Sequence, residues 1–222
     1  MEVEIKKIAK KYKKQQVLED VSLHAEGGKC IGILGCNGSG KSTFLSILAG
    51  VQASDAGAFL CDGADLFKDP KRRAKLVGYV PQGTPLLEEL TAWDNLLLWY
   101  DKKDLQRELE SGVLALLGIG EFLKTQVSKM SGGMKKRLSI GCAVAHAPSI
   151  LLLDEPTAAL DMVCKQNITS YLRNFKQRGG LLLLATHDVM ELDLCDEWYI
   201  LKDGRLEPFA YEGNVEELVR RL

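Results

Sequence analysis

Short apolar runs alternate with longer stretches of mixed polar and apolar residues along this chain. Val3–Ile8 and Val17–His24 alternate with the period of strands that have one solvated face, which predicts two antiparallel strands. Lys29–Leu34 is almost wholly apolar, as is typical of a strand buried on both faces. The elements expected next are a helix, a strand, a brief helix and a strand: Lys41–Ala49, Ala58–Cys61, Asp69–Lys75 and Leu76–Val80.

Residues 84–146 have another pattern. Their apolar positions recur at helical spacing and no strand-like run separates them, which predicts an inserted helical subdomain. Strands and helices then alternate again, as strand Ile150–Leu153, helix Met162–Arg178, strand Leu181–Ala185, helix Val189–Leu194, strand Glu197–Leu201, a hairpin and helix Val215–Arg221. We therefore expect one domain over 1–222, with an α/β core and antiparallel β subdomain from 1–83 and 147–222, and helices over 84–146.

The charge is balanced in sum but not in distribution. The 222 residues include 29 Lys and Arg against 30 Asp and Glu, so no nucleic-acid partner is expected from overall charge. Residues 6–14 nevertheless hold six Lys and no acid. This basic strip is open to three interpretations: a solvated strand edge, a surface attracted to anionic lipid, or a region of positive potential that favours an anionic ligand.

The chain shows no sign of crossing a membrane. Its aliphatic runs are far shorter than the roughly 18 apolar residues of a spanning helix, and the N-terminus lacks the apolar run of a secretory signal. The six Cys have no zinc-like spacing. We expect a reduced, cytoplasmic protein whose Cys are mostly apolar fillers.

The segment Gly35–Ser42 reads GCNGSGKS and matches the phosphate-loop pattern GxxxxGK[ST]. It follows a predicted buried strand and opens a predicted helix, which is the context the mechanism requires. Successive N–H groups and the helix dipole would surround a phosphate, Lys41 would contact the β- and γ-phosphates, and Ser42 would bind Mg²⁺. The nucleotide-binding candidates here are Gly35, Asn37, Gly38, Ser39, Gly40, Lys41, Ser42 and Thr43.

Two carboxylates end the buried strand Ile150–Leu153. In an open parallel sheet, ligands bind at the carboxyl edge. Asp154 is expected to orient Mg²⁺, and Glu155 to activate the attacking water. Together with the phosphate loop, this pair predicts an α/β fold with a phosphate-loop NTPase core and a mostly parallel sheet.

At this point the residues resemble the ATP-binding cassette (ABC) ATPases, over nearly the whole chain. Ser131-Gly132-Gly133-Met134-Lys135 looks like the signature loop of that family. The other matching motifs, in the family's order, are the glutamine loop Val80-Pro81-Gln82, the D-loop Ala159-Leu160-Asp161, the switch segment Thr186-His187-Asp188 and the aromatic Tyr12. Two positions depart from the common pattern, because Cys36 stands where Pro is usual and Met134 where Gln is commonest.

The resemblance implies a role for each matching residue. Catalysis would involve Glu155, His187, Gln82 and Lys41, and the metal would be held by Ser42, Gln82 and Asp154. Tyr12 would stack on adenine. Ser131, Gly132 and Gly133 of one subunit would cap the ATP of the other, with Asp161 coupling the two. The implied cofactors are ATP and Mg²⁺, and the implied assembly is a homodimer or heterodimer of ATPase subunits.

The leading function is therefore the ATP-hydrolysing subunit of an ABC transporter, peripheral on the cytoplasmic face of a membrane. A separate transmembrane permease subunit would seat a helix between the core and 84–146, in a groove for which Trp93, Trp99 and Tyr100 are candidates. Core packing is an equal alternative for each of them. Few residues follow the last predicted hairpin strand, which favours a subunit without an added C-terminal regulatory domain. The segment SGGMKKRLSIG resembles that of exporter-type ATPases, which favours an exporter. A soluble ABC machine acting on protein assembly, DNA or ribosomes is the alternative, and Glu155 disfavours a sensor without turnover.

Overall fold

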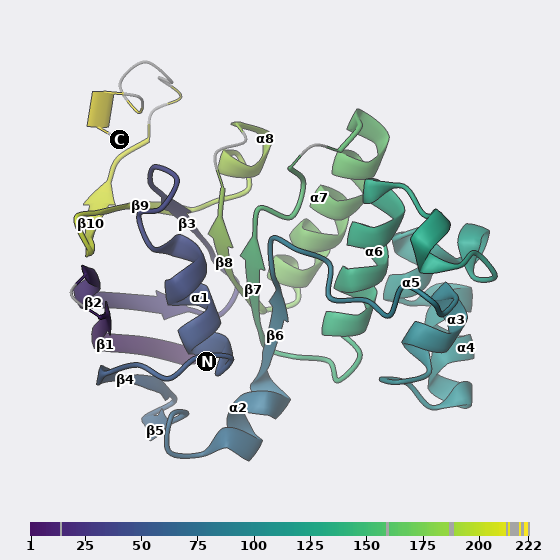
Figure 1. Cartoon of the computed structure of the whole chain (residues 1–222), viewed down its shortest axis with the longest axis horizontal. Helices are drawn as coiled ribbons and strands as arrows, with labels where there is room; N and C mark the ends of the chain where they lie inside the picture. Colours follow the sequence, from purple (N-terminus) through teal and green to yellow (C-terminus); the bar gives the residue numbers. More distant parts are fainter. Residues whose placement is uncertain are drawn as a thin grey trace.

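Two β-sheets and the helices around them make up the computed structural model (Figure 1). It describes residues 1–13, 15–158, 160–186, 189–211, 213, 218 and 220–221. The larger sheet has six strands in the order β10-β9-β3-β8-β7-β6. All its neighbouring pairs are parallel except β9 and β10. Its strands are β3 (Cys30–Leu34), β6 (Val77–Val80), β7 (Ile150–Asp154), β8 (Leu181–Ala185), β9 (Glu197–Lys202) and β10 (Arg205–Phe209).

The centre of this sheet is buried on both faces. Every residue of β3, β7 and β8 is buried, which explains their continuous apolar sequences. Alternate residues of one strand enter different cores, because successive side chains point to opposite faces. Ile150 and Leu152 pack in the core shared with helix α1 (Lys41–Ala49), whereas Leu151 and Leu153 pack with helix α7 (Met162–Gln177).

The second sheet is antiparallel, in the order β2-β1-β4-β5. Its strands are β1 (Glu2–Tyr12), β2 (Gln15–Glu26), β4 (Ala56–Cys61) and β5 (Ala64–Asp65). The expected alternation is present at Val3 and Ile5, and a register shift then brings Ile8 to the buried face as well. All three residues join the core of α1. The two-residue strand β5 was not expected, since it has too few residues to show a period.

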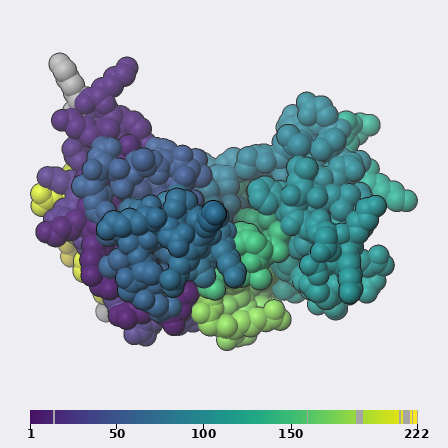
Figure 2. Space-filling model, turned by 90° about the horizontal axis from the view of Figure 1, so that it is seen from below, coloured from purple at the N-terminus to yellow at the C-terminus, as the bar shows by residue number. Residues whose placement is uncertain are grey.

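Between β6 and β7 the chain forms helices. They are α3 (Ala92–Leu96), α4 (Lys102–Ser111), α5 (Val113–Leu116), α6 (Gly132–Ala143) and two 3-10 turns, η1 (Ile119–Phe122) and η2 (Val127–Lys129). Within the described chain the only β pairing in this stretch is a single bridge between Thr91 and Gln126. This part forms the teal lobe in Figure 2, and the β-rich part forms the purple and blue lobe.

Local capping sets several helix ends. Asp69 accepts a bond from the Arg72 N–H, so α2 (Pro70–Leu76) begins one residue after the predicted start. Thr91 and Asp94 form a reciprocal capping box at α3. Helix α8 (Val189–Leu192) ends two residues earlier than predicted. The predicted helix Val215–Arg221 lies mostly outside the described residues.

Candidate functional site

The carboxyl ends of β3, β6, β7 and β8 share one edge of the parallel sheet. The loop after β3, residues 35–40, runs directly into α1. Gly35 has φ +156°, and a Cβ on it would lie 2.5 Å from both the Leu201 carbonyl oxygen and Ser39 Oγ. Gly40 has φ +106° at the N-cap of α1. Only glycine fits these two backbone positions without strain or collision.

The Lys41 side chain donates hydrogen bonds to the backbone of the loop. Its side chain is buried, and Nζ donates to the carbonyl oxygens of Gly35 at 2.6 Å and Cys36 at 3.1 Å. Burial lowers the pKa of the Lys41 ammonium, while Glu155 and Asp154 oppose that shift. An anion entering the loop would compete with these two carbonyls for a cation that is already in place.

Ser39 Oγ supplies a second reason to expect a ligand. It is among the few buried side-chain atoms without a hydrogen-bond partner in the described part of the chain. A buried hydroxyl with no partner is costly, because folding removes it from water. A phosphate oxygen in the loop is the kind of acceptor that would satisfy it.

Asp154 ends β7 and is 2% exposed. The Ser42 hydroxyl donates to its carboxylate, which joins the first turn of α1 to the acidic strand end. Burial raises the pKa of Asp154, and the Ser42 bond and Lys41 partly oppose this. Hydroxyl and carboxylate oxygens are hard donors, which suits Mg²⁺ when phosphate oxygens complete its shell.

Glu155 has an unusual backbone. Its φ is +49°, in the left-handed region, and its N–H donates to the Ala185 carbonyl at 2.9 Å. Such conformations in non-glycine residues are strained and cluster at functional sites. Gln82, which follows β6, donates from Nε2 to Glu155 Oε2 at 3.0 Å. The structure thus brings Lys41, Ser42, Asp154, Glu155 and Gln82 together at one sheet edge.

The signature turn lies elsewhere. Ser131 is exposed and caps α6 by accepting from the Met134 N–H at 3.3 Å. Gly133 packs against α7 so closely that a Cβ would lie 2.6 Å from Cys164 Sγ. Asp161 caps α7 by accepting from the Cys164 N–H at 2.9 Å. Figure 1 places α6 on the far side of β7 from α1, so this turn is separate from the phosphate loop of the same chain.

Tyr12 and His187, two further residues expected at the nucleotide, are not placed against the phosphate loop by the described contacts. Tyr12 is 42% exposed and its hydroxyl donates to Gln52 Oε1, while Lys10 Nζ lies 5.5 Å from its ring centre. These contacts tie it to the segment after α1, at the other end of this helix from the phosphate loop. His187 lies outside the described residues, as do Ala159 of the D-loop and Asp188 of the switch segment.

The three aromatic residues considered for the groove differ in how exposed they are. Trp99 is 62% exposed, and Trp93 is partly buried against the core of the helical part. Tyr100 follows the core-packing alternative, because it is 7% exposed and its hydroxyl donates to the Gly141 carbonyl at 2.9 Å. A residue flanked by exposed Trp99 carries no local sign of burial, so only the packing of α6 shows it.

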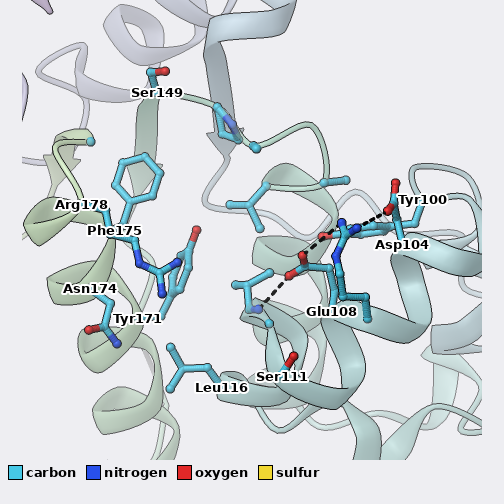
Figure 3. Close-up of a pocket in the computed structure, with 18 of the residues that line it drawn as sticks. Tyr100, Asp104, Glu108, Ser111, Leu116, Ser149, Tyr171, Asn174, Phe175 and Arg178 are labelled. Carbon is cyan, nitrogen blue, oxygen red and sulfur yellow. Dashed lines mark hydrogen bonds and ion pairs between the residues drawn. The ribbon is translucent and has the colours of Figure 1, made fainter.

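A cavity of about 610 Å³ lies between the helical part and the core (Figure 3). Its lining includes Tyr100, Glu108 and Leu116 on one side and Tyr171 and Phe175 of α7 on the other. The segments just before β7 and β8 also line it, so it opens at the amino edge of the parallel sheet. This is the edge opposite the phosphate loop.

Two buried polar residues near the site were missed by sequence reasoning. Glu191 is 2% exposed and accepts from the Thr157 N–H at 2.9 Å, which anchors the turn after Glu155. Lys136 is 5% exposed in α6. Lys136 lies within the quoted segment SGGMKKRLSIG but was given no role there, and Glu191 belongs to none of the quoted motifs. The only signal for Lys136 was a charge on the buried face of a predicted helix.

A glycine-rich loop between a buried strand and a helix, facing paired carboxylates, defines a phosphate-loop NTPase. The model of the ABC transporter family matches residues 18–158. The lipopolysaccharide export system ATP-binding protein LptB of Haemophilus influenzae is 32% identical over 225 residues, covering 97% of this chain and 93% of LptB. The linearmycin resistance ATP-binding protein LnrL of Bacillus subtilis is 31% identical over 220 residues, covering 97% of this chain and 70% of LnrL.

Solved structures of ATP-binding cassettes are also similar to this chain. A dimeric ATP-binding cassette in a post-hydrolysis state with ADP and Pi is 27% identical, with a TM-score of 0.82 over 96% of this chain and all of that chain. A nucleotide-free cassette has a TM-score of 0.86 at 22% identity over 99% of this chain and 96% of that chain, which supports the fold alone. The chain belongs to the ABC transporter family and is its ATP-binding, ATP-hydrolysing subunit.

Proposed function

We propose that hydrolysis takes place at the edge formed by Lys41, Asp154, Glu155 and Gln82. The observation that carries this assignment is the Gln82–Glu155 hydrogen bond, one residue from the buried Asp154. Glu155 acts on the attacking water, and Lys41 contacts the β- and γ-phosphates. The remaining nucleotide contacts fall to Gly35, Asn37, Gly38, Ser39, Gly40, Ser42 and Thr43, with Tyr12 on adenine and His187 at the γ-phosphate.

Mg²⁺ belongs to the same proposal. Ser42, Asp154 and the Gln82 side-chain oxygen provide hard donors from α1, β7 and the glutamine loop, which fits a metal that is bound mainly through phosphates. When bound, Mg²⁺ neutralises negative charge on the phosphates. Asp154 and Ser42 already lie within hydrogen-bond contact, so their own chain holds them ready for it.

We further propose that two such subunits enclose two ATP molecules. Ser131, Gly132 and Gly133 are at the N-terminus of α6, whose N–H groups and dipole suit a phosphate. The turn is remote from the phosphate loop of its own chain, so the nucleotide it contacts would belong to a partner. Asp161 lies beside it and would transmit nucleotide state between subunits, in a homodimer or a heterodimer.

The membrane partner is proposed to dock in the cavity between α4, α5 and α7. Residues 84–146 would act as a helical subdomain within one domain, on a core of 1–83 and 147–222. None of the described helices is long and apolar enough to span a bilayer. The cavity combines the apolar side chains of Leu116 and Phe175 with the charged side chain of Glu108 (Figure 3). Arg107 also lines it. Such a mixture suits an amphipathic helix.

The substrate direction we favour is export, at the cytoplasmic face of a membrane. LptB is named for lipopolysaccharide export, and a relative from Paraburkholderia xenovorans, 34% identical over 208 residues, is named Nod factor export ATP-binding protein I. The aligned region covers 91% of this chain and 68% of the Paraburkholderia xenovorans protein. These names support the direction and not a particular substrate.

Copurification tests the membrane partner. Leu116→Glu places a charge in the cavity wall, and we expect it to reduce the permease recovered from a membrane extract about 10-fold. Val51→Glu is the matched control, because Val51 is 69% exposed and does not line the cavity. Recovery of a soluble assembly in place of a permease would instead support the alternative of a non-transporter ABC machine. Equal recovery with both variants would reject the proposed docking site.

A further inference from the structure

Lys136 is a buried ammonium in the helix that begins at the signature turn. It lies five residues after Ser131 in α6 and is 5% exposed. Its Nζ donates to two consecutive backbone carbonyls, those of Pro81 and Gln82, at 3.0 Å each. One side chain of α6 is therefore fastened to the backbone of the glutamine loop.

Gln82 is held at both ends. Its carbonyl accepts from Lys136, and its side-chain amide donates to Glu155 Oε2 at 3.0 Å. The contacts form a continuous chain from the strand end of β7, through the glutamine loop, to the helix of the signature turn.

Burial and nearby carboxylates act in opposite directions on the Lys136 ammonium. Burial lowers the pKa of its ammonium, whereas Asp154, Glu191 and Glu155 act in the opposite direction. Asp154 and Glu155 also interact with Lys41, so the same two carboxylates act on one buried ammonium at the phosphate loop and on another in α6. A change in charge at this edge, such as arrival of ATP, is felt by both.

The neighbouring lysine shows what an ordinary surface contact looks like here. Lys135 Nζ pairs with Glu88 at 3.0 Å, and the Glu88 side chain is 63% exposed. Exposed pairs of this kind contribute little, since water screens them. Lys136, by contrast, bonds backbone carbonyls from a buried position, and an apolar replacement would remove the donor from both of them.

We propose that Lys136 is a positioning residue that couples the glutamine loop to the signature turn of the same chain. When ATP and Mg²⁺ draw the Gln82 side chain away from Glu155, the bond from Lys136 carries the movement of the loop into α6 and hence to Ser131–Gly133. The active site of one subunit thereby sets the orientation of the turn that caps the nucleotide of the other. This inference rests on the proposed roles of Gln82 and Glu155.

A double-mutant cycle tests the coupling. We expect Lys136→Met to lower kcat about 10-fold while the KM for ATP changes less than about 3-fold, because the nucleotide contacts remain. In a Gln82→Ala background, the same substitution should cause little further loss, since the residue acts through Gln82. Independent, multiplicative losses would overturn the proposal, and so would a wild-type kcat in Lys136→Met.

Dimer formation gives a second readout. In a Glu155→Gln background, Lys136→Met should weaken the ATP-driven dimer about 10-fold, measured by light scattering across protein concentration. An unchanged dimer would count against the coupling. If Glu155→Gln alone still hydrolyses ATP, the assignment of Glu155 fails, whereas the kcat cycle between Lys136 and Gln82 still tests Lys136.

Two further variants guard against a folding defect. Lys136→Gln keeps a hydrogen-bond donor without the charge and should recover part of the lost kcat. If Lys136→Met does not fold, Lys136→Gln takes its place in the cycle. Lys124→Met removes an exposed lysine of the helical part and is expected to match the wild type in kcat and dimerisation. A Lys136→Gln enzyme no better than Lys136→Met would reject the role of the hydrogen bonds.

Discussion

Gln82 Nε2 donates to Glu155 Oε2 at 3.0 Å, across two side chains that are 73 residues apart in sequence. The bond joins the end of β6 to the end of β7, at the edge of the sheet that carries the phosphate loop. It occupies the carboxylate that we assign to water activation. Binding of ATP and Mg²⁺ would have to rearrange this pair before hydrolysis, which makes the catalytic carboxylate sensitive to nucleotide state.

Glu155→Gln should separate binding from hydrolysis. Glutamine keeps the size of the side chain and tolerates the left-handed backbone no worse than glutamate, but it cannot act as a base. We expect ATP affinity near that of the wild type, hydrolysis reduced about 100-fold or more, and an ATP-dependent dimer in light scattering. The control is Glu121→Gln, which changes an exposed carboxylate of the helical part. Wild-type turnover in Glu155→Gln would refute the role of Glu155.

The role of Tyr12 depends on its ring. Stacking of an aromatic ring on a base contributes about 1–3 kcal/mol, so Tyr12→Ala should weaken ATP binding by roughly 5-fold to 160-fold. Tyr12→Phe loses only the bond to Gln52 and should bind ATP nearly as well as the wild type. Titration with a fluorescent ATP analogue measures both. Equal affinity for the alanine and phenylalanine variants would show that the ring is not a stacking platform.

Cys36 is a selective target for alkylation. It is exposed in the phosphate loop, and the other five cysteines are buried. We expect a maleimide to modify Cys36 first and to abolish ATP binding, because the adduct fills the loop. ATP present during labelling should protect the thiol. Cys36→Ala should bind ATP and resist the reagent, and a fully labelled wild-type protein that retains ATPase activity would contradict this expectation.

Asp154 should lower the stability of the nucleotide-free protein. Burial raises its pKa in the folded state, so the folded protein holds this proton more tightly than the unfolded chain does. Relative to the ionised form, protonated Asp154 contributes favourably to the free energy of unfolding. This contribution is fully present below the ordinary carboxyl pKa and is lost as pH rises through the pKa of Asp154 in the folded protein. Asp154→Asn stays neutral throughout. We expect its Tm to exceed that of the wild type by roughly 2–4 °C at neutral pH, and by much less in acid.

Thermal unfolding of both proteins across pH measures this difference. Asp193→Asn serves as the control, since Asp193 is exposed. A wild type that is the more stable of the pair at neutral pH would mean that Ser42 and Lys41 outweigh the cost of burial. Asp154→Asn should also lose Mg²⁺-dependent hydrolysis. The buried carboxylate would then be shown to lower the stability of the wild-type protein and to be required for its activity.

Much of the site was accessible from sequence because its motifs are local. Gly35 and Gly40 are glycines for backbone reasons that operate within a few residues, and Lys41 begins a helix where the pattern predicted one. Strands β3, β7 and β8 were visible as apolar runs, since burial on both faces leaves no polar position. The expected mostly parallel sheet and antiparallel N-terminal sheet are confirmed.

Contacts between distant segments are another matter. The sequence alone predicted most of the strands and helices and singled out Gly35–Ser42 as the candidate phosphate loop, because backbone strain, helical period and strand period act over short separations. Only the tertiary structure decided that Tyr100 is buried, that Lys136 fastens α6 to the glutamine loop, and that Gln82 lies against Glu155. These relationships depend on how α6 packs beside β6 and β7, and a local pattern does not encode the side-chain partners that such packing brings together.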